Sequence, residues 1–109
     1  MTRGEIWTVA GGAAYAGKPR PAVIIQDNRF DANDSVVVCP VTSDLTEAPA
    51  FRIPVAPDAE NGLRQPCRLM VDKVAAVPRT RLRRRVGLLG AEAMTDLNRA
   101  IIVFLGLGG

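Results

Sequence analysis

The chain contains no histidine, and this absence excludes several kinds of active site. Paired-imidazole acid–base catalysis, Ser-His-Asp and Cys-His arrangements and the usual zinc sites all require that residue. Gly-rich phosphate loops are also missing, because Gly11-Gly12 and Gly17-Lys18 have the wrong spacing. An enzyme built from this chain must therefore use Arg, Lys, Asp, Glu, Ser, Thr, Tyr or Cys.

Cysteine is scarce, and the apolar runs are short. Cys39 and Cys67 form no C-x-x-C pair and have apolar neighbours, so we expect reduced, buried thiols; the sequence leaves a bridge between them open. The amino terminus lacks the apolar core of a signal peptide. The longest apolar run, 100–107, is far below the ~20 residues of a membrane-spanning helix. These features predict a cytoplasmic protein without membrane contact.

Metal-binding patterns are also lacking. Asp27, Asp31 and Asp34 do not have the spacing of a calcium loop, and aspartates of this kind are common in turns. We therefore expect a turn surface here, and neither a metal nor an organic cofactor.

The length of 109 residues and the 48% of apolar residues predict a single domain over 1–109. Small domains bury a low fraction of their surface, so we expect association with a second copy. Of the 14 cations, all but Lys18 and Lys73 are arginine, and five arginines lie within 79–85. Guanidinium groups match phosphate oxygens, so this segment predicts attraction to a polyanion or an acidic protein tail. The alternative is a solvated strand edge kept soluble by its charge.

Short β-forming segments dominate the chain. Strands are predicted over 5–10, 21–25, 35–41, 51–55, 67–77 and 83–89, with 67–77 the longest. Near the end the period changes, because Met94, Leu97, Ile101, Phe104 and Leu105 recur at steps of three and four, as in an amphipathic helix that Gly106 can end. This order favours a mainly β fold, a small barrel with one helix packed on it.

Four segments, in order and over nearly the full length, carry a family resemblance. They are RGEIW at 3–7, GKPRPAVII at 17–25, VVVCPVTS at 36–43 and VDK at 71–73, the last followed by RL at 81–82, VGLL at 86–89 and a C-terminal helix that ends in LGL at 105–107. Together they resemble the MazF/PemK family of toxin endoribonucleases from type II toxin–antitoxin systems. The resemblance implies an SH3-like barrel of about five to seven short strands with a C-terminal helix.

The same resemblance implies activity and partners. The expected activity is ribosome-independent cleavage of single-stranded mRNA at short sequence motifs. The expected partners are a second copy in a homodimer and a cognate antitoxin, whose flexible acidic tail occupies the RNA groove; DNA is reached only through that antitoxin.

The site residues carried over from the family are Arg20, Thr42 and Asp72. Two departures concern the chemistry: Met70 stands where some relatives have a basic residue, and Cys67 where serine is common. Further contacts to RNA are expected from Lys18, Ser43, Tyr15 and Arg81, with Tyr15 stacking on a base.

RNA supplies its own nucleophile, the 2′-hydroxyl, and cleavage through it needs no metal. Arg20, held between two prolines, would stabilise the charge on the phosphate oxygens; the alternative is a surface arginine. Thr42 would hold the scissile phosphate, or cap a turn. Asp72 would accept the 2′-hydroxyl proton or orient Arg20, or form a salt bridge with Lys73 or an arginine. The products would be a 2′,3′-cyclic phosphate, or its 3′-phosphate, and a 5′-hydroxyl.

Two rival functions share this barrel. A CcdB-type gyrase poison acts by protein binding, but the Arg20 and Thr42 elements and the ending Leu107-Gly-Gly do not favour it. A non-catalytic barrel that binds nucleic acid or a protein tail stays open from the sequence.

Overall fold

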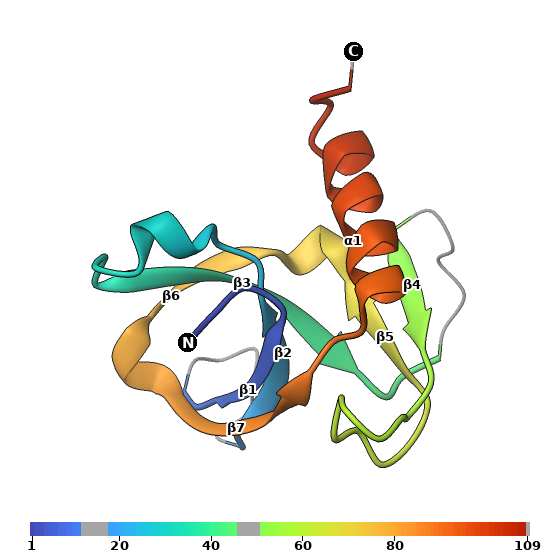
Figure 1. Cartoon of the computed structure of the whole chain (residues 1–109), viewed down its shortest axis with the longest axis horizontal. Helices are drawn as coiled ribbons and strands as arrows, with labels where there is room; N and C mark the ends of the chain where they lie inside the picture. Colours follow the sequence, from blue (N-terminus) through green and yellow to red (C-terminus); the bar gives the residue numbers. More distant parts are fainter. Residues whose placement is uncertain (12–17, 46–50, 109) are drawn as a thin grey trace.

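The computed structural model describes residues 1–11, 18–45 and 51–108. Most elements are short strands, and one helix follows them (Figure 1). The strands are β1 (Glu5–Val9), β2 (Arg20–Ile24), β3 (Ser35–Thr42), β4 (Arg52–Val55), β5 (Cys67–Met70), β6 (Ala75–Pro78) and β7 (Leu82–Leu88). Three short 3₁₀ turns, η2 (Asn28–Phe30), η3 (Val71–Lys73) and η4 (Arg79–Arg81), and the helix α1 (Ala91–Phe104) complete the described elements. The mainly β class with a C-terminal helix is confirmed.

The long, valine-rich strand β3 joins the two parts of the sheet. All pairings are antiparallel, and the order is β4-β5-β3-β2-β1-β7, with β6 also paired to β3. The first half of β3, Ser35 to Val38, pairs with β6, and its end, Val41 and Thr42, pairs with β5. In Figure 1 β3 crosses the molecule from the β6 side to the β5 side.

The predicted single strand over 67–77 is wrong, because η3 divides it into β5 and β6. Between the pairs Val41↔Leu69 and Val38↔Ala75, β3 moves by three residues while its partner moves by six. The three surplus residues are Val71–Lys73, which leave the ladder. Val71 becomes buried in the core beneath the helix, with Leu97. A continuous apolar run gives no sign of such an insertion.

The barrel has two hydrophobic cores, because side chains that alternate along a strand point to opposite faces of the sheet. In β2 the side chain of Val23 belongs to a core with Ile6, Leu69 and Leu97, whereas Ala22 and Ile24 belong to a second core. The second core also contains Val9, Val36, Val38, Val77 and Leu82. This period-two division is that of a strand with both faces covered.

Helix α1 covers the first core with side chains between Ala93 and Ile101, and its C-terminal end extends beyond the barrel (Figure 1). Leu97 is fully buried, and the rings of Phe51 and Phe104 lie 5.9 Å apart. Gly106 at φ +72° ends the helix as predicted, and the Leu107 N–H donates to the Ile102 carbonyl. No described helix has the length and apolarity needed to cross a bilayer.

The sequence left open whether Cys39 and Cys67 form a disulfide, and the structure shows that they do not. Cys39 and Cys67 are both free and buried. The β3–β5 register, continued from Val41↔Leu69, sets Cys67 opposite Ser43, four residues along β3 from Cys39. Four residues of strand span about 13 Å, well beyond the ~7 Å limit between bridged Cα atoms.

Candidate active site

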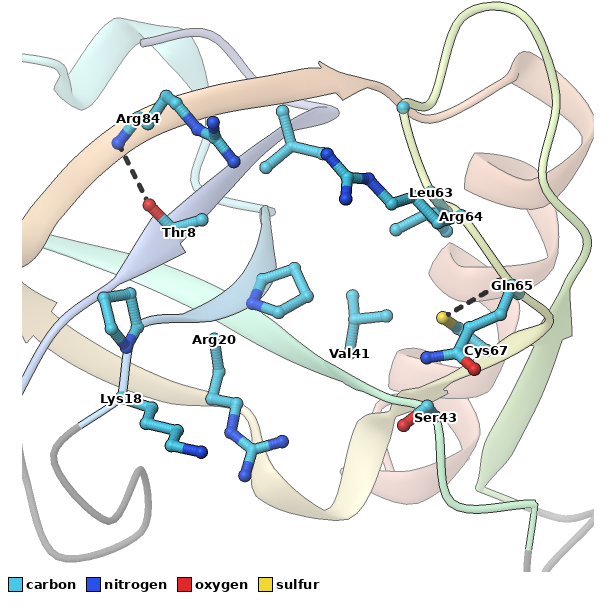
Figure 2. Close-up of a pocket in the computed structure, with 14 residues that line it drawn as sticks. Thr8, Lys18, Arg20, Val41, Ser43, Leu63, Arg64, Gln65, Cys67 and Arg84 are labelled. Carbon is cyan, nitrogen blue, oxygen red and sulfur yellow. Dashed lines mark hydrogen bonds between the residues drawn. The ribbon is translucent and has the colours of Figure 1, made fainter.

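A cavity of about 400 Å³ opens beside the start of β2 and the end of β3 (Figure 2). Its cations are Lys18, Arg20, Arg64 and Arg84. Its other polar side chains are Thr8, Ser43, Gln65 and Cys67, and its apolar wall includes Pro21, Val41, Leu63 and Val86. The size and the mixture of apolar wall and few polar groups are those of a ligand site.

Among the described residues, the lining of the cavity contains four cations and no carboxylate. Within the part of the chain that the structure describes, none of the four cations has an ion-pair partner. Elsewhere, arginines do find carboxylates, as Arg52 does at Asp72 and Arg85 at Glu5. Concentrated, uncompensated positive charge in a concave site attracts a polyanion.

Arg20, the first residue of β2, is exposed at the edge of this cavity. Its backbone lies opposite Val9 of β1, and Pro19 and Pro21 restrict the chain on both sides. Figure 2 shows Lys18 and Arg20 on one side of the cavity, and Arg64 and Arg84 on the other. The cations therefore frame the hollow from two sides.

The hydroxyl that lines the cavity belongs to Ser43, and not to Thr42. Thr42 is half-buried, and its Oγ1 accepts a hydrogen bond of 3.1 Å from the Asp44 N–H, which is the turn-capping alternative raised from the sequence. If the β2–β3 register runs on from Ala22↔Pro40 by two residues, Thr42 lies opposite Arg20. The two strands thus bring Arg20 and Thr42 near each other, but Thr42 does not line the cavity, whereas Arg20 and Ser43 do.

Asp72 lies in η3, outside the cavity lining. Arg52 of β4 donates to both of its carboxylate oxygens, from Nε at 3.0 Å and from Nη2 at 3.3 Å. Lys73 adds a longer contact of 3.9 Å. The side chains of Arg52 and Asp72 are only 17% and 20% exposed, so this is a partly buried, two-point ion pair. The salt-bridge alternative is what the structure contains.

Of the remaining predicted contacts, Lys18 lines the cavity and Arg81 does not. Arg81 is exposed in η4, and its guanidinium lies beside Gly11. Tyr15 lies outside the described residues.

Sequence reasoning missed Arg64 and Gln65, and it named Arg84 only within the arginine-rich segment 79–85. The register of β7 against β1 shifts between Arg85 and Gly87, so alternation alone does not show which arginine of β7 lines the cavity. Arg64 and Gln65 come from the loop between β4 and β5, and no periodic signal places a loop residue.

Neither thiol is suited to nucleophilic chemistry. Burial, followed by the nearby negative charge of Asp72, raises the pKa of the Cys39 thiol to about 12. Burial also raises the pKa of Cys67, whose Sγ donates to the Gln65 carbonyl at 3.2 Å. A thiol with a raised pKa is mostly protonated near neutral pH and unreactive. Among the described residues, no group of three or more Cys, Asp or Glu side chains is placed to hold a metal ion. A nucleophile brought by the substrate fits this inventory.

Comparison with known proteins decides the family. The model of the PemK-like, MazF-like toxins of type II toxin–antitoxin systems matches residues 2–105. The chain belongs to this family. It is 50% identical over 109 residues, the whole of both chains, to a probable endoribonuclease MazF of Mycolicibacterium smegmatis. It is 28% identical over 116 residues, 98% of both chains, to endoribonuclease MazF9 of Mycobacterium tuberculosis.

Solved structures of MazF toxins share the fold. The Mycobacterium tuberculosis toxin MazF-mt6 superposes with a TM-score of 0.77 at 28% identity, covering 94% of this chain and 96% of that one. MazF from Deinococcus radiodurans gives a TM-score of 0.79 at 18% identity over 97% and 96% of the chains. A mycobacterial endoribonuclease solved with its cognate antitoxin gives 0.77 at 19% identity over 97% and 93%. The SH3-like, MazF-like barrel expected from the sequence is thereby confirmed.

Proposed function

We propose that this MazF-like toxin is a metal-independent endoribonuclease of single-stranded RNA, formed by one toxin domain over 1–109. One observation carries the proposal: the described lining of the cavity has four cations without ion-pair partners among the described residues and no carboxylate, in a protein without histidine or a reactive thiol. Positive charge attracts the RNA backbone, and the 2′-hydroxyl supplies the nucleophile that the protein lacks.

In the reaction, the 2′-oxygen forms a bond to the adjacent phosphorus and loses its proton, and the bond from phosphorus to the 5′-oxygen breaks. The leaving 5′-oxygen gains a proton, so the products are a 2′,3′-cyclic phosphate and a 5′-hydroxyl. Charge accumulates on the non-bridging oxygens in the transition state, and a fixed guanidinium next to them lowers the barrier. Positioning of the strand for in-line attack supplies a further part of the rate.

Arg20 is the residue we assign to the transition-state charge, because it is exposed at the cavity edge and pairs with no carboxylate of the described residues. We propose that two neighbouring hydroxyl groups bind the scissile phosphate, those of Ser43, which lines the cavity, and Thr42. The Thr42 Oγ1 accepts a hydrogen bond from the Asp44 N–H, so its own hydrogen is available to donate to a phosphate oxygen. We assign Asp72 to the ion pair with Arg52 and not to proton transfer, because both of its carboxylate oxygens already accept hydrogen bonds from Arg52. Lys18 adds positive charge beside Arg20, and Arg81 is a peripheral contact.

We infer that the toxin works in the cytoplasm as a homodimer neutralised by a cognate antitoxin. The apolar end of α1 supports a second copy, since Val103 and Leu107 are 75% and 72% exposed. An acidic antitoxin tail fits the same unpaired cations as RNA does, and DNA is reached only through the antitoxin.

The test is incubation of the purified protein with a long RNA in EDTA, followed by primer extension and by analysis of the new ends. We expect cuts at a short motif, with 5′-hydroxyl ends that polynucleotide kinase labels without prior phosphatase treatment. Loss of cleavage in EDTA, with recovery on adding a divalent cation, would refute the metal-independent reaction. Intact RNA together with inhibition of gyrase would indicate the CcdB-type activity, and binding without cleavage a non-catalytic barrel.

A further inference from the structure

The loop before β5 and the strand β7 approach each other more closely than side chains allow. A Cβ at Gly62, where φ is +68°, would lie 2.2 Å from the Val86 carbonyl oxygen. A Cβ at Gly87 would lie 2.4 Å from the Asn61 carbonyl. Only glycine fits at both points. The Leu88 N–H then donates to the Glu60 carbonyl at 2.9 Å, so the loop is fastened to β7 by its backbone.

Asn61 fixes the shape of the same loop from within. It is fully buried, and its Oδ1 accepts from the N–H groups of Asp58 and Leu63 at 3.2 and 3.0 Å. Its Nδ2 donates to the Ala56 carbonyl at 2.9 Å. The part of the loop from Ala56 to Leu63 is therefore held at a defined position against β7. Arg64 is the next residue of the same loop.

This docking brings two guanidinium groups to one side of the cavity. Arg64 follows Gly62 by two residues, Arg84 precedes Val86 by two, and all four residues line the cavity. Figure 2 shows the Arg64 and Arg84 side chains extending toward each other, across the hollow from Lys18 and Arg20. In the described part of the chain neither arginine has a carboxylate partner. Two like charges held together in this way are stabilised by an anion between them.

We propose that Arg64 and Arg84 form a second phosphate-binding site, which holds a phosphodiester of the RNA next to the one that is cut. The proposal rests on the proposed function, because it places the two phosphates on opposite sides of one cavity. The Arg84 N–H donates to Thr8 Oγ1 at 3.1 Å, which leaves the Thr8 hydroxyl hydrogen for a phosphate oxygen. Val41 and Leu63 line the space between the two sides, where the nucleoside would lie.

A contact to a phosphate that does not react stabilises the bound substrate and the transition state alike. Loss of such a contact weakens binding, while the rate at saturating RNA is unchanged. Loss of a contact to the scissile phosphate, such as that of Arg20, lowers the rate at saturation. Each phosphate contact on a single strand also contributes about 0.7 to the slope of log affinity against log salt.

The test compares Arg64→Ala and Arg84→Ala with Arg83→Ala. Arg83 is the matched control, because it is the neighbouring exposed arginine of β7 and lies outside the cavity lining. Binding is measured by fluorescence anisotropy on a labelled RNA that carries 2′-O-methyl groups throughout, so that it cannot be cut, at several salt concentrations. Cleavage of ordinary RNA is measured in single turnover at saturating protein in EDTA.

For the two cavity variants we expect a Kd raised by roughly 10-fold at low salt and a salt slope reduced by about 0.7 each, as for a lost backbone contact. Their saturated cleavage rates should stay within about twofold of the wild type. Arg83→Ala should change the Kd by less than about threefold, as expected for a charge at the periphery.

The proposal is overturned if Arg64→Ala and Arg84→Ala match Arg83→Ala in both Kd and salt slope. It is also overturned if they lower the saturated rate as strongly as Arg20→Ala does. Thermal unfolding of the double variant, Arg64→Ala with Arg84→Ala, separates these outcomes from misfolding. Because both side chains are exposed, its unfolding temperature should match that of the wild type. A wild type that binds the RNA with the expected slope but does not cut would refute the proposed function and leave the phosphate site standing.

Discussion

Two groups of arginines in this toxin lie in different settings. Arg52 and Arg85 donate to carboxylates, those of Asp72 and Glu5, whose side chains are only 20% and 15% exposed. The arginines around the cavity meet no carboxylate within the described residues. The same side chain thus has two uses: a paired arginine stabilises the fold, and an unpaired one in a concave site is available to a ligand. Separate losses of stability and of activity test this division.

The largest effect is expected at Arg20. Arg20→Ala should lower the single-turnover cleavage rate by about 100-fold or more, the effect of removing one preorganised donor from a developing anion. Its free energy of unfolding should change by less than about 0.5 kcal/mol, because the side chain removed is exposed and has no ion-pair partner among the described residues. Arg85→Ala, outside the cavity, is the control and should cleave at close to the wild-type rate. Equal losses of cleavage rate in Arg20→Ala and Arg85→Ala would contradict the distinction between paired and unpaired arginines.

Backbone contact between the loop before β5 and β7, rather than ion pairing, positions Arg64 and Arg84, and Gly87→Ala should break this contact. The added Cβ would lie 2.4 Å from the Asn61 backbone, and we expect about 2–3 kcal/mol of destabilisation in urea unfolding. Gly90→Ser is the matched control. It adds atoms where no heavy atom lies within 4 Å, at an N-cap that favours serine, so it should be neutral or slightly stabilising. A neutral Gly87→Ala would show that the loop is not held against β7.

The loss of stability on removing a paired arginine should depend on how deeply its ion pair is buried. Arg52→Ala leaves the Asp72 carboxylate partly buried without its two-point partner, and we expect a loss of about 1–2 kcal/mol. Arg29→Ala removes a pair whose side chains are 80% and 49% exposed, and should leave the urea-unfolding curve indistinguishable from that of the wild type. Asp72→Asn should resemble Arg52→Ala in stability and keep the saturated cleavage rate. If Asp72→Asn alone loses that rate, Asp72 is the proton acceptor and not an ion-pair partner.

The smallest effect concerns pH and Glu5. Burial raises the pKa of Glu5, but hydrogen bonds from Thr2, Arg85 and Trp7 and the charged amino terminus outweigh it and lower the pKa from 4.5 to about 2. Because the folded pKa is below the unfolded one, this stabilisation is present above pH 4.5 and is lost as the pH falls toward 2. Urea unfolding between pH 6 and pH 3 should show the decline, on the order of 1 kcal/mol, and Glu5→Gln should reduce it. An unchanged decline in Glu5→Gln would assign it to other carboxylates.

The sequence predicted the elements better than their contacts. Valine-rich β3 and the period of α1 are local patterns, and both were found where expected. Thr42 and Ser43 differ by one position, and in a strand one position reverses the face, so pattern alone could not choose the hydroxyl in the cavity. The Arg52–Asp72 pair joins β4 to η3, and Arg64 reaches the cavity through the docking of a loop on β7. Such contacts depend on tertiary packing and leave no local signal.

The most direct test of the central claim uses an RNA with a single 2′-deoxy substitution at the nucleotide 5′ to the mapped cut. Single-turnover cleavage is measured in EDTA beside the unmodified RNA. If the unpaired cations act on a reaction whose nucleophile is the RNA's own 2′-hydroxyl, the substituted RNA should bind within about twofold of the unmodified one, because the phosphate contacts are kept. Cleavage at that bond should then be lost completely. Cutting of the substituted bond at the normal rate would contradict the account.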